Sequence, residues 1–338
     1  MAEDPRITAL AQDKHLQDAD CSGLDLSGAD LSGARMLRVR LDGAELSGAN
    51  LSGATLEACQ AEGARFSNAG MEEAAFEACK LQGARFDGCN GTFAAFEGSN
   101  LARADFSGAL LERALFKDCG LDRTAFHDAS LRRARFMQCG LTAAGFKNAV
   151  LVMAVMANVD MSGLSFPGCD LRMAMFEDAI LHGTSFAGQD VTQCRFERCE
   201  LKDADFRGAS GRFAFFQGAG LHKAAFADAE LPNVDFSSAD LQSADFSRAA
   251  LSAGLFHDAD CRQTLFCKAR LEYADFSRAR VEGADFSGAC LGSTNLHRVD
   301  RNAASWSGAD LESVRETDQP LLDAETWRPK TKPATEHP

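Results

Sequence analysis

The stretch Phe236-Ser-Ser-Ala-Asp-Leu241-Gln-Ser-Ala-Asp-Phe246-Ser-Arg-Ala-Ala-Leu251 repeats a single five-residue pattern. A large apolar residue recurs at every fifth position, and a small residue lies two positions before it. The same register begins at Leu16 and ends at Leu311 without an insertion or deletion, which makes 60 consecutive pentapeptides. A fixed short period of this kind indicates a chain that stacks on itself as a solenoid and forms one domain.

The position of glycine indicates where the chain turns. We call the large residue of each pentapeptide its centre. In an extended chain the centre and the residue two before it point to the same side, so both are expected to face the interior. Because five is odd, this alternation cannot continue into the next pentapeptide, and a turn must follow. Of the 29 glycines, 20 lie two positions after a centre, which marks this position as the corner.

Phenylalanine follows a second, longer period. Of 25 phenylalanines, 22 occupy alternate centres, and leucine dominates the centres between them. If four pentapeptides close one coil, a coil of 20 residues places Phe on two opposite walls and Leu on the other two. A helix is excluded, because a spacing of five residues would rotate each centre by about 140° and spread the apolar residues around the helix.

The pentapeptides also share the motif Ala-(Asp/Asn)-(Leu/Phe)-X-X, seen as Ala29-Asp-Leu-Ser-Gly33, Ala104-Asp-Phe-Ser-Gly108 and Ala284-Asp-Phe-Ser-Gly288. This motif resembles the signature of the pentapeptide-repeat proteins, and the resemblance covers about nine tenths of the chain. It implies an all-β fold, a right-handed quadrilateral β-helix with four pentapeptides in each coil. Sixty pentapeptides then predict about 15 coils and, at about 4.8 Å per coil, a rod roughly 70 Å long.

The two ends of the chain depart from the repeat. Open ends of a β-helix would expose unpaired backbone, so caps are expected there. Residues 1–15 are predicted to form an N-terminal cap with a short helix over Asp4–Ala11, residues 16–313 the β-helix, and residues 314–338 a C-terminal cap and a disordered tail. Near the C-terminus, three apolar residues either lie over the last coil or carry a partner subunit: Leu321, Leu322 and Trp327.

Composition and charge restrict the classes of partner. The net charge of −14 argues against general binding to the nucleic-acid backbone, although an acidic chain can bind what normally binds DNA. The first residues lack the basic and apolar regions of a secretory signal, and the longest apolar run, Val150–Val159, is too short to span a bilayer. We therefore expect a cytoplasmic protein with no membrane contact.

Twelve cysteines raise the possibility of disulfides or zinc. Eight of them occupy the small position of the pentapeptide, where alanine is usual, and are predicted to be buried free thiols. These eight are Cys59, Cys79, Cys89, Cys119, Cys139, Cys169, Cys194 and Cys199. The seven histidines are scattered, and no cysteine or carboxylate spacing completes a metal site. We predict that the protein is not an enzyme and has no catalytic residue, metal or cofactor.

One corner of the predicted rod departs from a polar surface. It combines the residues two after the centres of one wall with those just before the centres of the next. The residues predicted to bind a partner there are Leu115, Arg135, Met153, Val155, Met173, Met175, Arg195, Phe213, Phe215, Leu255 and Tyr273. Alternatively, Phe93 and Phe213 fold inward, because each follows a glycine at a centre position. This alternative leaves the methionines outside.

These observations predict a rigid scaffold that binds a protein partner, or another copy of itself, along this edge, since Met, aromatic residues and Arg are enriched at interfaces. The resemblance also suggests a DNA-mimicking modulator of DNA gyrase, similar to the Qnr proteins, with a topoisomerase as the partner. The acidic residues are spread over all four walls, however, which weakens this alternative. A third interpretation is an accessory factor of a bacterial secretion system.

Overall fold

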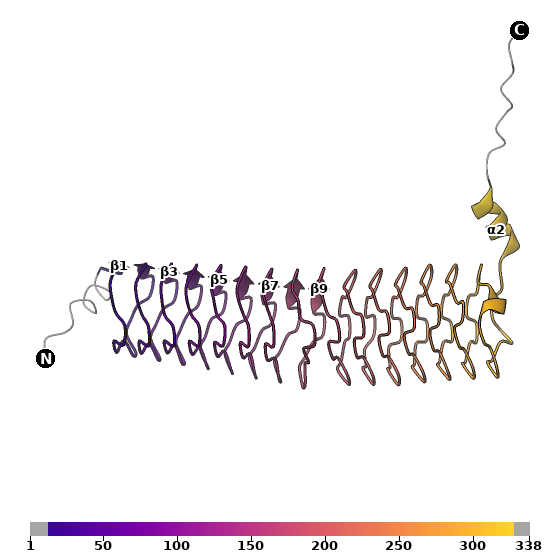
Figure 1. Cartoon of the computed structure of the whole chain (residues 1–338), viewed down its shortest axis with the longest axis horizontal. Helices are drawn as coiled ribbons and strands as arrows, with labels where there is room; N and C mark the ends of the chain where they lie inside the picture. Colours follow the sequence, from indigo (N-terminus) through magenta and orange to yellow (C-terminus); the bar gives the residue numbers. More distant parts are fainter. Residues whose placement is uncertain (1–12, 328–338) are drawn as a thin grey trace, which may run out of the picture.

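The computed structural model of the protein describes residues 13–327, which form a rod of stacked coils with a short helix at its C-terminal end (Figure 1). The helix expected over Asp4–Ala11 and the tail 328–338 lie outside the described residues. The rod begins at the first strand and its repeated pairing continues to Arg315.

Nine three-residue strands stack along one wall of the rod, and each strand pairs in parallel with the next. They are β1 (His15–Gln17), β2 (Arg35–Leu37), β3 (Thr55–Glu57), β4 (Ala75–Glu77), β5 (Ala95–Glu97), β6 (Leu115–Lys117), β7 (Arg135–Met137), β8 (Val155–Ala157) and β9 (Met175–Glu177). The partners are always 20 residues apart, as in His15↔Arg35 and Val155↔Met175. The predicted all-β solenoid with four pentapeptides per coil is thus confirmed.

The other three walls are held by single bridges rather than by strands. We number the walls by their centres: wall 1 contains Leu41, wall 2 Leu46, wall 3 Leu51 and wall 4 Leu56, and each wall continues at intervals of 20 residues. After β9, wall 4 also makes only isolated bridges, the last being Asn295↔Arg315. The sequence predicts about 15 coils, and a regular strand is present in nine of them.

The change in wall 4 follows from its turns. On the other walls the amide three residues after a centre usually donates to the carbonyl of that centre, as Ala29 N does to Leu26 O at 3.1 Å. Within the described chain, wall 4 lacks this bond as far as Phe176 and gains it at Phe196, where Cys199 N donates to Phe196 O at 3.2 Å. A closed turn leaves less extended chain for the ladder, so the strand shrinks to one bridge.

The open turns of wall 4 give several cysteines a specific role. In six coils, a side chain in the small column that follows wall 4 donates to the carbonyl of a wall 4 centre, with donor to acceptor distances of 3.1–3.3 Å. The donors are Cys59, Cys79, Ser99, Cys119, Cys139 and Cys199. These side chains donate to the carbonyls of wall 4 centres, which receive no hydrogen bond from a turn amide. These cysteines are therefore more than enlarged alanines, although the eight that the sequence predicts to be buried free thiols are all buried and outside any disulfide.

The core is built from two columns of phenylalanine on opposite walls. Rings within one column are nearly parallel, as Phe66 and Phe86 are at 4.8 Å between centroids, whereas rings from opposite walls meet edge to face, as Phe66 and Phe76 do at 6.0 Å. The predicted stacking of like on like is confirmed. Met156 interrupts the column of wall 4, and Phe146 and Phe166 are tilted by 34°.

The corners and the recurring aspartates also have local explanations. All 20 corner glycines adopt the left-handed conformation, with φ between 57° and 73°. Aspartate just before a centre accepts a hydrogen bond from the amide just after it, as Asp235 Oδ1 does from Ser237 N at 2.8 Å. This contact orders the chain through the turn, so the aspartate of the motif has a structural function.

The C-terminal end contains a 3₁₀ turn, η1 (Arg301–Ala303), and a helix, α2 (Gln319–Thr326), which projects beyond the outline of the coils (Figure 1). Asp318 caps α2 by accepting from Leu321 N at 2.9 Å. No residue of α2 is buried, and the exposed fractions of Leu321 and Trp327 are 47% and 72%. Among residues 13–327 no helix is long and apolar enough to cross a membrane.

Candidate protein-binding edge

The corner between walls 3 and 4 brings most of the predicted binding residues into adjacent coils. Leu115, Arg135, Val155 and Met175 begin the last four strands, β6 to β9, and form one continuous ladder. The ladder continues through the bridges Met175↔Arg195 and Arg195↔Phe215. We call the eleven residues predicted from the sequence the apolar edge, and seven of them lie in this column, since Leu255 belongs to it two coils after Phe215.

The second column of the apolar edge lies at the corner position of wall 3. Met153, Met173, Phe213 and Tyr273 have φ values of 58°, 61°, 54° and 63°. The left-handed conformation costs an L-residue with a β-carbon roughly 1–2 kcal/mol, and glycine occupies many other corners. Bulky side chains are thus present here against the local backbone preference, and the corner directs them away from the core.

Exposure differs along the edge. The exposed fractions are 38% for Met173, 46% for Phe213, 36% for Phe215, 38% for Leu255 and 69% for Tyr273. Met153, Val155, Met175 and Leu115 are half-buried, while Arg135 and Arg195 are exposed. A soluble protein seldom leaves neighbouring large apolar side chains in water without a function.

The structure does not bring all eleven residues together. Asp235 lies between Phe215 and Leu255 in the ladder, and Asp275 follows Leu255. Leu255 and Tyr273 are thereby separated from the part of the edge between Leu115 and Phe215. Large exposed apolar residues also occur away from this corner, at Leu110, Ile180 and Leu265.

The alternative in which Phe93 and Phe213 fill the core beneath a glycine is wrong. Phe93 is 49% exposed, and the guanidinium of Arg113 lies 5.2 Å from the centre of its ring. The space at Gly91 is already filled, because a Cβ placed there would lie 3.0 Å from Leu111 Cδ2 and 3.7 Å from Met71 Cε. Neighbouring core side chains close this gap, so the Phe93 ring stays outside.

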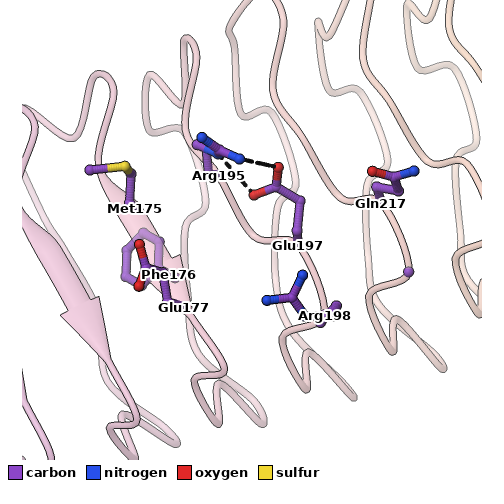
Figure 2. Close-up of a pocket in the computed structure, with 8 residues that line it drawn as sticks. Met175, Phe176, Glu177, Arg195, Glu197, Arg198 and Gln217 are labelled. Atoms are coloured by element: carbon purple, nitrogen blue, oxygen red, sulfur yellow. Dashed lines mark hydrogen bonds and ion pairs between the residues drawn. The ribbon is translucent and has the colours of Figure 1, made fainter.

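A depression of about 530 Å³ adjoins the apolar edge on wall 4, where the strands end. Met175 and Arg195 line it from the edge side, together with Glu177, Glu197 and Gln217 (Figure 2). Arg195 points toward Glu197 and pairs with it at 2.9 Å, and this carboxylate raises the pKa of Arg195. The guanidinium predicted to meet a partner is therefore partly engaged within the chain.

The same corner is basic, although the protein is acidic. The edge was predicted from the positions two after and one before a centre, and these positions do not include the arginines one after the centres of wall 3. Between Glu112 and Phe215, these three positions together contain seven arginines and one acid. The arginines are Arg113, Arg132, Arg133, Arg135, Arg172, Arg195 and Arg212. A count of charge by corner rather than by wall would have revealed them.

Two of the seven arginines are paired within the chain. Arg172 pairs with Asp170 at 2.6 Å, and Arg195 with Glu197. The other five form no ion pair with any residue between 13 and 327. Over the same range, no three His, Cys, Asp or Glu side chains are grouped so that they could hold a metal ion. The corner thus offers apolar contact and unpaired positive charge, and no described group for metal chemistry.

Family models of the repeat match most of this chain. The family described as "Pentapeptide repeat region" matches residues 36–106, 109–186, 129–206 and 159–236. The family described as "Pentapeptide repeats (8 copies)" matches residues 15–53, 219–258 and 255–292. The chain is a pentapeptide-repeat protein. No curated protein sequence is significantly similar to this pentapeptide-repeat protein.

Solved structures with similarity to this pentapeptide-repeat protein include QnrB1, a plasmid-mediated fluoroquinolone resistance protein, at 20% identity and a TM-score of 0.41. That match covers 58% of this chain and 93% of QnrB1. HetL, involved in heterocyst differentiation regulation in Nostoc sp. strain PCC 7120, is 20% identical over 89% of this chain and 88% of its own, with a TM-score of 0.16. Rfr23 from the cyanobacterium Cyanothece 51142 is 22% identical over 29% and 64% of the two chains, with a TM-score of 0.22. The family assignment rests on the repeat matches and not on these structures.

Proposed function

We propose that this pentapeptide-repeat protein is a rigid, cytoplasmic, non-enzymatic scaffold that binds a protein partner or another copy of itself along the apolar edge. The observation that supports this most is the row of half-buried and exposed apolar side chains from Leu115 to Phe215, bordered by unpaired arginines. Exposed apolar groups with arginine and aromatic residues are the composition of interface hot spots.

The coil supports a scaffold role because it fixes the spacing of these side chains. The amide of each ladder residue donates to the carbonyl of the residue that precedes its equivalent in the coil before, as Val155 N does to Ala134 O at 2.9 Å and Met175 N to Ala154 O at 2.9 Å. The stacked rings beneath the corner leave little freedom for the wall to bend. A partner therefore meets a surface that is already ordered, which lowers the entropic cost of binding.

The test is the triple variant Met153→Ser, Met173→Ser and Met175→Ser. It is expected to fold as the parent does, because these side chains point outward, and to show weaker self-association or partner capture. The matched control changes three exposed apolar residues elsewhere, Leu110→Ser, Ile180→Ser and Leu265→Ser. If the methionine variant keeps the parent's oligomeric mass and captures the same proteins, the edge is surface variation and the proposal fails.

The gyrase interpretation needs a continuous acidic face that imitates duplex DNA. Many carboxylates of this rod are instead paired with arginine in the neighbouring coil, as Asp18 is with Arg38 at 2.6 Å and Asp228 with Arg248 at 2.6 Å. This pairing weighs against DNA mimicry. A supercoiling assay with added protein tests it, and inhibition of gyrase or protection from a drug at stoichiometric protein would favour it instead. A role beside a secretion system stays a prediction that the genomic neighbourhood tests.

A further inference from the structure

The arginines of the edge constrain the chemistry of its partner. Five of them form no ion pair among residues 13–327, in a chain whose net charge is −14. Arg133 and Arg135 lie one coil before Met153 and Val155, and Arg212 precedes Phe213. A complementary partner therefore carries carboxylates together with large apolar side chains, because the apolar column separates the positive groups.

The C-terminal segment of the same chain has this composition. Residues 316–327 contain four acids and no lysine or arginine, and they include Leu321, Leu322 and Trp327. Asp318 and Asp323 form no ion pair with any residue of the described chain. Trp327 is 72% exposed, whereas Leu321 and Asp318 line a depression against His297 and Arg315 of their own rod. The segment thus combines acidic side chains with an unburied tryptophan.

The base of α2 is anchored to its own rod. Glu325 pairs with Arg298 at 3.0 Å and with Arg278 at 3.4 Å, and its Oε2 lies 3.3 Å from His297 Nε2. His297 Nδ1 accepts from Asp318 N at 3.2 Å, so the other ring nitrogen can donate to Glu325. These contacts hold on wall 4 the side of α2 that carries Leu321 and Glu325, which are one turn apart. Asp323 and Trp327, also four residues apart, lie on the other side of α2, which is free.

The helix cannot reach the edge of its own chain while these contacts hold. Phe215 lies four coils before Asn295, which corresponds to about 19 Å along the rod at about 4.8 Å per coil. A helix of eight residues is only about 12 Å long. Any contact between α2 and the arginine-rich part of the edge must therefore come from a second copy.

We propose that α2 of one copy docks on the apolar edge of another, between Arg133 and Phe215. This proposal rests on the function proposed above for the edge and names its occupant. The helix pitch of about 5.4 Å is close to the coil spacing, so Asp323 and Trp327, which are one turn apart, can meet successive rows of the edge. Asp323 then meets an unpaired arginine, while Trp327 covers the methionines.

The contact joins two different surfaces, so it is heterologous, and each copy presents one donor helix and one acceptor edge. This property gives a sharp test. The acceptor variant Arg133→Glu with Arg135→Glu reverses the charge of the edge, and the donor variant Asp323→Ser with Trp327→Ser removes the free helix surface. By sedimentation equilibrium the parent should exceed the mass of one chain, 36.2 kDa, and each variant alone should return to it. An equimolar mixture should form a pair, because one intact edge and one intact helix remain.

A matched control keeps the charge change but moves it off the edge. Arg103→Glu with Arg270→Glu alters the same two positions of the pentapeptide, two after and one before a centre, on other corners of the rod. This control should retain the parent's mass, whereas the acceptor variant should raise the dissociation constant by about tenfold or more. Raising the salt from 0.05 M to 0.5 M should also weaken the parent's association, since charge attraction is screened.

Several outcomes would overturn the proposal. They are a parent that stays at 36.2 kDa, a donor variant that associates like the parent, and a mixture of the two variants that remains unassociated. The edge could instead bind another part of a second copy or a different acidic protein. Association would then be lost in the methionine variant but retained in the donor variant. In that case the edge still binds a protein, and only α2 is excluded as its occupant.

Discussion

Replacing Phe106 with alanine tests how much stability the stacked rings supply. Phe106 is fully buried, and its ring stacks on Phe86 at 4.6 Å and Phe126 at 5.3 Å. It also meets Phe96 at 5.6 Å and Phe116 at 5.7 Å edge to face. A buried Phe→Ala change costs about 3–5 kcal/mol through lost transfer energy and the remaining cavity. Because four ring contacts are lost together, we expect a value near the upper end.

The assay is native-state hydrogen exchange read by mass spectrometry, because a repeat array opens locally and a single unfolding midpoint would hide the effect. A loss of about 3 kcal/mol or more corresponds to at least about a hundredfold faster exchange, which should be confined to the coils between Phe86 and Phe126. Phe106→Leu keeps much of the volume and should cost about 1–2 kcal/mol. Unchanged exchange in Phe106→Ala, or a change no larger than that of the exposed control Leu110→Ala, would refute the reasoning.

Three further predictions concern the thiols, the corners and α2. Among the twelve cysteines, only exposed Cys290 should react quickly with a thiol reagent. Cys267 should follow more slowly, because burial and a neighbouring carboxylate raise its pKa. All twelve should react in denaturant, and rapid reaction of a third thiol in the native protein would contradict this prediction. Gly48→Ala should cost about 1 kcal/mol in chemical denaturation, because φ is +66°, whereas Gly48→Asn should cost less, since asparagine tolerates this conformation. Hydrogen bonds from its histidine and arginine partners lower the pKa of Glu325, so its contact stabilises α2 above the ordinary carboxyl value of 4.5 and is lost as pH falls through the lowered value. Glu325→Gln should therefore increase proteolysis of α2 at neutral pH, and equal cleavage of the variant and the parent would count against the anchor.

Much of the fold could be predicted because it depends on residue size at fixed positions. The centres, the small residues and the corner glycines each fill one geometric role, and the sequence shows all three without interruption. The switch of wall 4 at Phe196 was not predictable in this way, because Phe176 and Phe196 are the same residue type in the same column. The difference is the backbone hydrogen bond from Cys199 N to Phe196 O, which has no equivalent at Phe176, and the side chains do not indicate it.

The edge was predicted less completely than the fold. The five-residue register places Val155 beside Met175 without ambiguity, so the apolar column could be predicted. The engagement of Arg195 by Glu197 could not, because an arginine can pair along its own turn, as this one does, or across coils, as Arg38 does with Asp18. The orientation of α2 depends on contacts of Glu325 with residues 27 and 28 positions away, which the repeat does not encode.

The uninterrupted register fixes two coordinates for every surface residue: its angle around the rod axis, here called its bearing, and its height along that axis. Removing one whole coil of 20 residues would shorten the rod but leave all bearings unchanged, so the two parts of the edge would rejoin. Removing a single pentapeptide would keep the five-residue register, yet every later residue would rotate by a quarter turn and phenylalanine centres would stack on leucine centres. Removing one pentapeptide between Val155 and Met175 would thus split the edge between two adjacent corners. In such a molecule the length of an insertion or deletion, counted in fives or in twenties, decides whether a binding surface survives.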